Sequence, residues 1–257
     1  MAQFPSPGGS IDTWGTELIE ALLVSHNMDG TLKKDDYTKL LIHFDGVDGS
    51  KANYTAETGQ IVSMGTALGN DAQLDTAQNK FGSASLLLDG TTDYVTVPAS
   101  EDWNFGTGDF TIDCWVRWNV LPSSGSWSMI FSQYVDTTHY SHLGLTNNAG
   151  VYTLNFTEVR DGSWIINKII TPVINRWYHI AVIRYGSIGK IYFDGVGGDS
   201  TDLTGATFSN LAVVPQIGAW STILVFNGWI DEFRISKGIA RWTANFTPPS
   251  LPYVLIK

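Results

Sequence analysis

The chain has 257 residues, which suits one large β domain with an extension, or two modest domains. Hydrophobic residues make up 43% of the sequence and charged residues only 16%, a composition that favours a β-sandwich over a helical bundle. The formal net charge of −10 repels the phosphates of nucleic acids and of anionic membranes, so neither is an expected partner. Because no stretch approaches ~18 apolar residues, we expect no membrane insertion.

Residues 1–39 differ in pattern from the rest of the chain. The opening string MAQFPSPGGS has no basic region and no apolar stretch, so we expect no signal peptide. Asp12 is the predicted N-cap of a short helix in which Trp14, Leu18 and Leu22 form one apolar stripe. A helix this short is marginal alone, so the stripe must dock on the sandwich, a sister subunit or a partner protein. We predict that residues 1–39 are an attachment or oligomerisation segment.

From Leu40 onward the apolar side chains recur with a period of two. The segments with this pattern are LLIHFDG, SASLLLDG, DYVTVP, FTIDCWVRW, SMIFSQY, HLGLTN, VYTLNF, SWIINKII, WYHIAVIRY, KIYFDG and WIDEFRIS. Short strands separated by turn signals, several of them Asp-Gly pairs, predict an antiparallel sandwich or barrel. We therefore expect one all-β domain over residues 40–257, ending in an extended, Pro-rich tail that Trp242, Phe246 and Tyr253 pack along the sandwich.

Cys114 is the only cysteine, which excludes an intrachain disulfide and a CxxC metal site. Alternation in FTIDCWVRW places it on the same face as Phe110 and Trp118, so we predict a buried, unreactive thiol. Asp113 faces the other way and is predicted to be a solvated or hydrogen-bonded sheet residue. We expect His179, in WYHIAV, to be hydrogen-bonded inside a core strand.

Four strings in a fixed order carry a resemblance to a known family. They are SASLLLDGTTDYVTVP, GDFTIDCWVRW, NRWYHIAVIRYGSIGKIYFDG and FNGWIDEFRISKGIARW. Together they resemble the laminin-G-like jelly rolls of the concanavalin A-like lectin/glucanase superfamily, over about residues 40–253. The resemblance implies two antiparallel sheets packed face to face as a jelly-roll sandwich.

Two further strings resemble bacteriophage proteins. RISKGIARWTANFTPPSLPY is similar to modules of phage structural proteins, and SIDTWGTELIEALLVSHNMDGTLK resembles an N-terminal element of phage tail fibres. This resemblance implies a virion location, with assembly in the bacterial host cytoplasm. It also implies that residues 1–39 bind other virion proteins and that the chain is a homotrimer.

The sequence lacks the active-site motifs of several enzyme classes. Laminarinase-like members of the superfamily carry ExDxE or ExDxxE, but none of the six glutamates here has Asp two residues later. HExxH, GxSxG and a P-loop are also absent. An unrelated carboxylate pair could assemble across strands, for instance Asp113 with Glu158, but nothing in the spacing favours it. We predict that the protein is not an enzyme.

The resemblance implies one structural calcium ion where the first and last strands meet. Asp45 in HFDG and Asp231 in GWIDEF match the positions that line such a site. A hard cation takes six to eight oxygen ligands and could pin terminal strands that otherwise fray. In the alternative interpretation, Asp231 only accepts backbone hydrogen bonds at the start of a strand.

Carbohydrate binding uses exposed aromatic rings against sugar C–H faces and polar groups for the hydroxyls. Among ten tryptophans, three lie in or beside predicted loops and are candidates for contact with a glycan. The predicted glycan-contacting residues are Trp127, Asp136, Asp161, Trp164 and Trp220.

Three functions remain open. The first is a non-enzymatic virion appendage or decoration protein whose lectin-like domain binds host or environmental polysaccharide. The second is a purely structural capsid or tail brace without a ligand. The third, ranked last, is a polysaccharide-degrading enzyme with an atypical carboxylate pair. Glycan binding separates the first from the second, and release of reducing ends would favour the third.

Overall fold

The structure is a computed structural model that describes residues 35–65, 69–160, 163–208, 211–221 and 224–255. Within it, Tyr37–Tyr253 form one compact unit. The helix predicted after Asp12 and most of the segment 1–39 lie outside the described residues, so both stay predictions.

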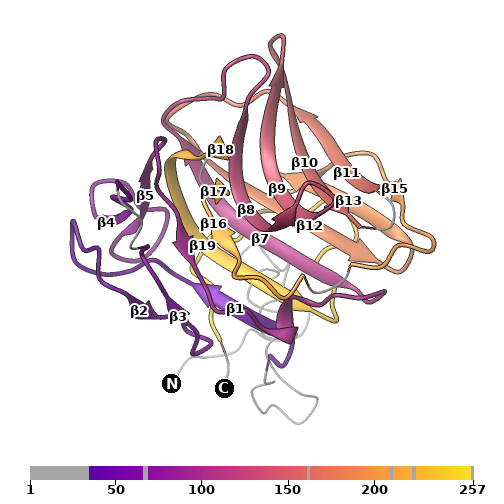
Figure 1. Cartoon of the computed structure of the whole chain (residues 1–257), viewed down its shortest axis with the longest axis horizontal. Coiled ribbons are helices and arrows are strands. Elements are labelled where there is room, and N and C mark those ends of the chain that lie inside the picture. Colours follow the sequence, from indigo (N-terminus) through magenta and orange to yellow (C-terminus); the bar gives the residue numbers. More distant parts are fainter. Residues whose placement is uncertain (1–34, 66–68, 161–162, 209–210, 222–223, 256–257) are drawn as a thin grey trace, which may run out of the picture. The chain divides into compact units, whose positions relative to one another are not determined.

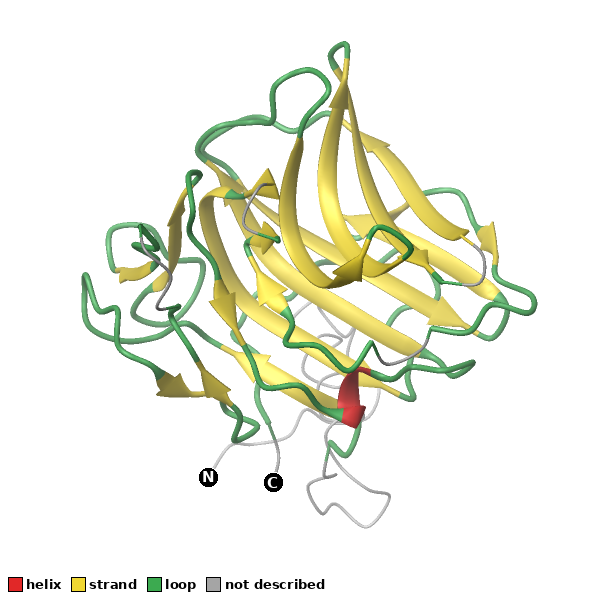
Figure 2. Ribbon diagram, viewed as in Figure 1, coloured by secondary structure: helices red, strands yellow, loops and turns green. Residues whose placement is uncertain are grey.

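The described part of this unit is all-β, as expected, and contains two large antiparallel sheets (Figures 1 and 2). The first has nine strands in the order β14-β13-β12-β7-β19-β5-β4, with β1 also paired to β19 and β15 to β13. Its strands are β1 Thr38–Ile42, β4 Gln73–Asp75, β5 Ser85–Asp89, β7 Phe110–Trp118, β12 Trp177–Tyr185, β13 Ile188–Phe193, β14 Val196–Gly197, β15 Thr201–Asp202 and β19 Asn227–Lys237.

The second sheet has six strands in the order β11-β10-β9-β8-β16-β6. Its strands are β6 Val95–Thr96, β8 Trp127–Asp136, β9 His139–Asn148, β10 Val151–Val159, β11 Ser163–Ile170 and β16 Gln216–Ile217. The remaining elements are two small ladders and one 3-10 helix. They are β2 Tyr54–Thr55 with β3 Ile61–Val62, β17 Ala219–Trp220 with β18 Leu224–Val225, and η1 Glu101–Trp103.

The core lies between the two sheets and follows the alternation in the sequence. In β7, Ile112, Cys114 and Trp118 are fully buried in it, so the prediction of a buried thiol is confirmed. Across the sandwich, Phe131 of β8 and Leu143 of β9 point into the same core. No helix in the described part of the chain has both the length and the apolar character needed to cross a membrane.

The outer face of the nine-stranded sheet carries a buried polar network. Arg234 donates from Nε and Nη2 to the two carboxylate oxygens of Asp113, each at 3.0 Å. Tyr253 donates its hydroxyl to Asp113 and lies 2.9 Å from His179 Nε2. Asp113 is therefore a hydrogen-bonded sheet residue, as predicted. His179, buried in β12, is also hydrogen-bonded as predicted, and its partner is Tyr253 of the tail.

The C-terminal tail covers this network. Trp242 and Phe246 stack with ring centroids 4.1 Å apart and pack against Tyr192 and its neighbours on the sheet. Phe246 donates its N–H to the carbonyl of Gly195 at 3.0 Å, and a Cβ at position 195 would collide with the Phe246 carbonyl. The predicted packing of the tail along the sandwich is confirmed.

Candidate functional site

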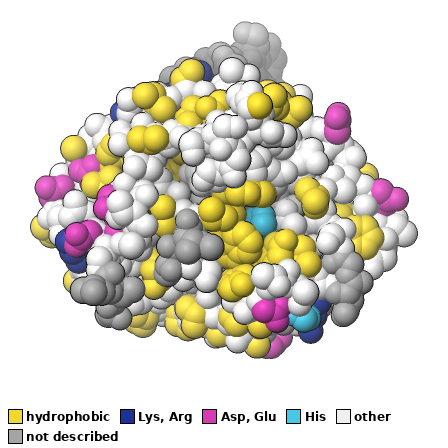
Figure 3. Space-filling view, turned by 45° about the horizontal axis from the view of Figure 1, so that its top comes forward, with side chains coloured by type: hydrophobic (Ala, Val, Ile, Leu, Met, Phe, Trp, Pro, Cys, Tyr) yellow, Lys and Arg dark blue, Asp and Glu magenta, His cyan; other side chains and the backbone are white. Residues whose placement is uncertain are grey.

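A group of ring side chains lies on the outer face of the six-stranded sheet. It consists of Trp127 and Tyr134 of β8, Tyr140 and His142 of β9, and Trp220 of β17, and is called the aromatic cluster below. The register pairs Tyr134 with Tyr140 and places His142 opposite Ser132. Phe131 of β8 and Leu143 of β9 lie in the core, so Tyr134, Tyr140 and His142 point outward. Trp127 shares this face because a register shift between Met129 and Phe131 interrupts the alternation of β8. Trp220 joins the group through its contact with the His142 ring. Figure 3 shows one face of the molecule on which hydrophobic side chains gather around a histidine.

His142 is the centre of the cluster. Its ring lies 4.8 Å from the Trp127 ring, 5.3 Å from Tyr140 and 5.4 Å from Trp220, measured between centroids. The planes of His142 and Tyr140 are nearly parallel, at 2°. Tyr134 closes the group with an edge contact to Trp220 at 5.4 Å.

Polar atoms inside the aromatic cluster have unused hydrogen-bonding capacity. His142 is 3% exposed, and neither of its ring nitrogens has a hydrogen-bond partner. Trp220 Nε1 is buried without a partner as well. Burial lowers the pKa of His142 to about 4, so the ring is neutral at pH 7. An unpaired buried polar group costs ~1–3 kcal/mol, a cost that a ligand supplying partners would remove.

A charged hairpin adjoins one end of the aromatic cluster. Asp136 follows Tyr134 in β8, accepts hydrogen bonds from Thr138 and pairs with His139 Nδ1 at 3.1 Å. The hydrogen bonds from Thr138, followed by that from His139, lower the pKa of Asp136 to about 2. An exposed carboxylate therefore stands beside the aromatic rings.

A pocket of about 290 Å³ adjoins the other end of the aromatic cluster. Trp127 belongs to both, because it lines the pocket as well as contacting His142. The other lining residues are Gly90, Val120, Leu121, Pro122, Ser126, Ser128, Val225 and Asn227.

Comparison with known families supports the fold on sequence grounds. The Laminin_G_3 family model, described as Concanavalin A-like lectin/glucanases superfamily, matches residues 89–241. This match spans more than half of the 257 residues. The chain belongs to this superfamily. Comparison with curated proteins gave no match.

Solved structures share the fold of this concanavalin A-like domain at low sequence identity. The binding domain of Paraclostridial Mosquitocidal Protein 1 has 18% identity and a TM-score of 0.58, over 80% of this chain and 50% of that chain. The binding domain of botulinum neurotoxin serotype D has 15% identity and a TM-score of 0.58, over 80% and 49%. This chain thus spans about half the length of these toxin domains.

This chain matches almost the whole length of a third similar structure. Domain 4 of AbnA, a GH43 extracellular arabinanase from Geobacillus stearothermophilus, was solved in complex with arabinotriose. It has 17% identity and a TM-score of 0.57, over 79% of this chain and 93% of that chain. These likenesses establish the fold of the concanavalin A-like domain.

The structure brings only some of the predicted glycan-contacting residues together. Trp127 and Trp220 both contact His142, and Asp136 lies in the adjoining hairpin. Trp164 is partly buried and packs against the core, so it does not join the aromatic cluster. Asp161 lies outside the described residues.

The tryptophans were predicted in or beside loops because their flanking residues are turn formers. Trp127 begins β8, Trp164 is the second residue of β11 and Trp220 ends β17, so all three lie beside loops, as predicted. Tyr134 and Tyr140 were not predicted to lie beside His142. The alternation of β8 and β9 was the signal that could have placed all three on one face.

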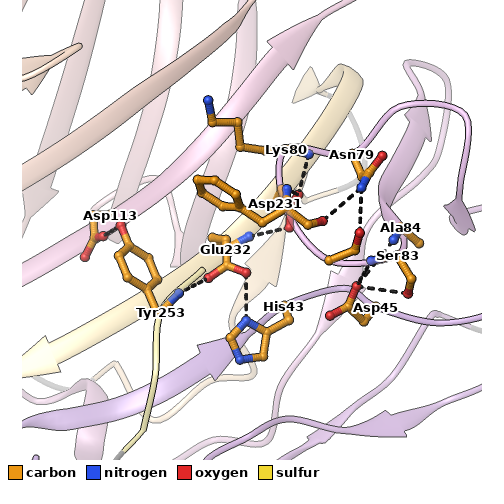
Figure 4. A network of polar contacts seen from close by, with 12 residues as sticks. His43, Asp45, Asn79, Lys80, Ser83, Ala84, Asp113, Asp231, Glu232 and Tyr253 are labelled. Carbon is orange, nitrogen blue, oxygen red and sulfur yellow. Dashed lines mark hydrogen bonds and ion pairs between the residues drawn. The ribbon is translucent and has the colours of Figure 1, made fainter. Parts of the chain in front are cut away.

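The predicted calcium residues of this concanavalin A-like domain hold one loop, residues 79–84 (Figure 4). Asp231 Oδ2 accepts the N–H groups of Lys80 and Phe81 at 2.8 and 3.1 Å. Asp45 Oδ1 accepts from the N–H and hydroxyl groups of Ser83. The two carboxylates, from the segment after the first strand and from the last strand, thus converge on the same loop.

Two features near this loop suit a cation. Burial raises the pKa of Asp231 to about 8, since no cationic side chain is paired with its carboxylate in the described structure. The buried Tyr54 hydroxyl has no hydrogen-bond partner, and the charges of Asp231 and Asp45 add to the effect of burial in raising its pKa. However, the described residues contain no group of three or more His, Cys, Asp or Glu side chains placed for a metal. A cation here would need carbonyl or hydroxyl oxygens besides the two carboxylates.

Asp113 and Glu158, the carboxylate pair of the enzyme alternative, lie on different sheets. Asp113 lies on the outer face of the nine-stranded sheet and is bound by Arg234. Glu158 belongs to β10 of the other sheet, in register with Ser141, where burial raises its pKa to about 8.

Proposed function

We propose that this chain is a non-enzymatic carbohydrate-binding protein whose aromatic cluster contacts the glycan. The observation that carries the proposal is the buried, neutral His142 beneath partly exposed aromatic rings. Rings of this kind pack against sugar C–H faces, and unpaired ring nitrogens can pair with hydroxyl groups. Rotation of Tyr140 or Trp220, both partly exposed, would open His142 to a ligand hydroxyl.

The fold supports the same class of ligand by analogy. AbnA domain 4, which has a similar fold, was solved with arabinotriose. Fold analogy is a weaker basis than a site, so the proposal rests mainly on the geometry of the aromatic cluster.

Substitution of the cluster tests the proposal. Trp127→Ala and Trp220→Ala should each weaken binding to the best ligand of a glycan array by roughly tenfold or more, which corresponds to about 1.4 kcal/mol. Tyr185→Ala, which removes an exposed ring at the end of β12 in the other sheet, is the matched control and should retain wild-type affinity. Absence of glycan binding by the wild type at high micromolar concentration would refute the proposal.

We further propose that the protein is a virion appendage or decoration, attached through residues 1–39 to other virion proteins and assembled as a homotrimer. Copies in a trimer would give weak sugar sites avidity. The alternative, a purely structural brace, predicts no glycan binding. An enzyme would release reducing ends from a bound polysaccharide, and we expect none.

One structural calcium ion completes the proposal. Asp45 and Asp231 would hold it, and its charge would offset the cost of ionising the buried Asp231. Bound there, the ion would tie the segment after β1 and strand β19 to the loop 79–84.

A further inference from the structure

We propose that the pocket and the aromatic cluster form one extended site for an uncharged oligosaccharide of at least two units. One unit would occupy the pocket, and the next would cross Trp127 onto the rings of the cluster. This inference rests on the proposed function and adds the class and minimum length of the ligand.

The two parts of the site are built by the same elements. Trp127, the first residue of β8, lines the pocket and contacts His142. In the small ladder, Val225 of β18 lines the pocket, whereas Trp220 of β17 belongs to the cluster. A chain that leaves the pocket over Trp127 would therefore meet the rings of the cluster next.

The size of the pocket limits what it can hold. Its volume of about 290 Å³ is at the lower limit of small-molecule pockets, which span ~300–1,000 Å³. Such a pocket suits one sugar ring rather than a whole chain. Further units must therefore bind outside it, where Trp127 and Trp220 offer ring surfaces.

The charge of the site favours a neutral ligand. None of the described residues that line the pocket is charged. Their polar side-chain groups are the hydroxyls of Ser126 and Ser128, the amide of Asn227 and the indole N–H of Trp127. His142 is neutral, and the exposed carboxylate of Asp136 adjoins the far end of the cluster. Carboxylated or sulfated sugars would meet no cation in the pocket, and the chain as a whole carries a net charge of −10.

The test uses the full chain and begins with an array that holds matched neutral and acidic glycans of one to six units, including lactose and sialyllactose. Calorimetry then measures the affinities of the mono-, di- and trisaccharide that make up the best neutral ligand. We expect affinity to rise at least tenfold from one unit to two or three. We also expect each acidic glycan to bind more weakly than its neutral match.

A pocket-filling variant isolates the contribution of the pocket. Ser126→Phe should abolish the increase in affinity with the length of the oligosaccharide. Ser123→Phe, at an exposed position outside the pocket lining, should preserve that increase. If Ser126→Phe fails to fold, Val120→Trp replaces it, because Val120 lines the pocket and is 53% exposed.

The outcomes separate the two proposals. Glycan binding that is independent of chain length, unchanged in the pocket-filling variant, or stronger for acidic glycans would overturn the extended neutral site and leave the proposed function standing. No glycan binding at all would overturn both.

Discussion

Two buried carboxyl groups of this domain have opposite electrostatic surroundings. Burial alone would raise the pKa of Asp113, but the charge of Arg234, helped by His179, lowers it to about 2. Glu158 is also buried, but the opposing effects of Arg160 and Ser141 are too weak, and its pKa rises to about 8. The first carboxyl is thus ionised and paired at pH 7, and the second is mostly protonated.

Removal of Arg234 should leave an unpaired buried charge. We expect Arg234→Met to lower the free energy of unfolding by about 3–5 kcal/mol in urea denaturation, as for other broken buried ion pairs. The control is Arg176→Met, which removes an exposed partner of Asp194 at 3.3 Å and should cost at most about 1 kcal/mol. Equal losses in both variants would contradict this account of the Asp113 network.

The raised pKa of Glu158 makes stability depend on pH. An unfolded glutamate ionises near pH 4.5 and the folded one near pH 8, so this group stabilises the fold fully below pH 4.5 and loses that effect as pH rises to 8. Glu158→Gln should therefore be more stable than the wild type at pH 8, with the difference shrinking toward pH 4.5. Thermal melts across this range measure it, with the exposed Glu57→Gln as control. A difference in stability between Glu158→Gln and the wild type that stays constant with pH would contradict the raised pKa of Glu158.

At the scale of elements, strand β19 organises the nine-stranded sheet. It pairs with β1, β5 and β7, and its register with β7 shifts between Asp231 and Arg234. Glu232 within this bulge has a positive φ of 51° and binds His43 at 2.7 Å and the N–H of Tyr253 at 2.8 Å (Figure 4). The bulge thus joins the first strand, the last strand and the tail.

Calcium should act at this junction. We expect EDTA to lower the melting temperature and added Ca²⁺ to restore it, because the ion would tie the loop 79–84 to both carboxylates. Asp231→Asn should abolish the response. Asp48→Asn, which changes an exposed carboxylate that accepts from Thr76, should preserve it. If neither EDTA nor Ca²⁺ changes the melting temperature of the wild type, the proposed calcium ion is refuted.

At the scale of the whole molecule, the domain is expected to work as several copies. Light scattering of the full chain should give the mass of a trimer. Deletion of residues 1–36, which leaves β1 intact, should give a monomer, because the predicted helix needs a partner surface. The shortened chain should keep the thermal melt of the sandwich. Monomers in both preparations would remove the support for assembly through this segment.

The sequence by itself determined the longer strands, the buried face of β7 and the all-β class, but not short strands such as β4 and β16. These features depend on a period of two within each segment, which is a local property of the chain. The Asp-Gly turns were equally visible, and Gly90 and Gly195 have the expected positive φ of 82° and 75°.

Only the tertiary structure decided which side chains share a site. Trp127, His142 and Trp220 meet because β9 pairs with β8 in one register and β16, just before Trp220, pairs with the other edge of β8. Trp164 looked equivalent in its local sequence, yet its register with Glu158 turns it toward the core. Strand pairing joins residues nearly a hundred positions apart, and a shift of one residue would reverse every side chain, so no local pattern could specify it.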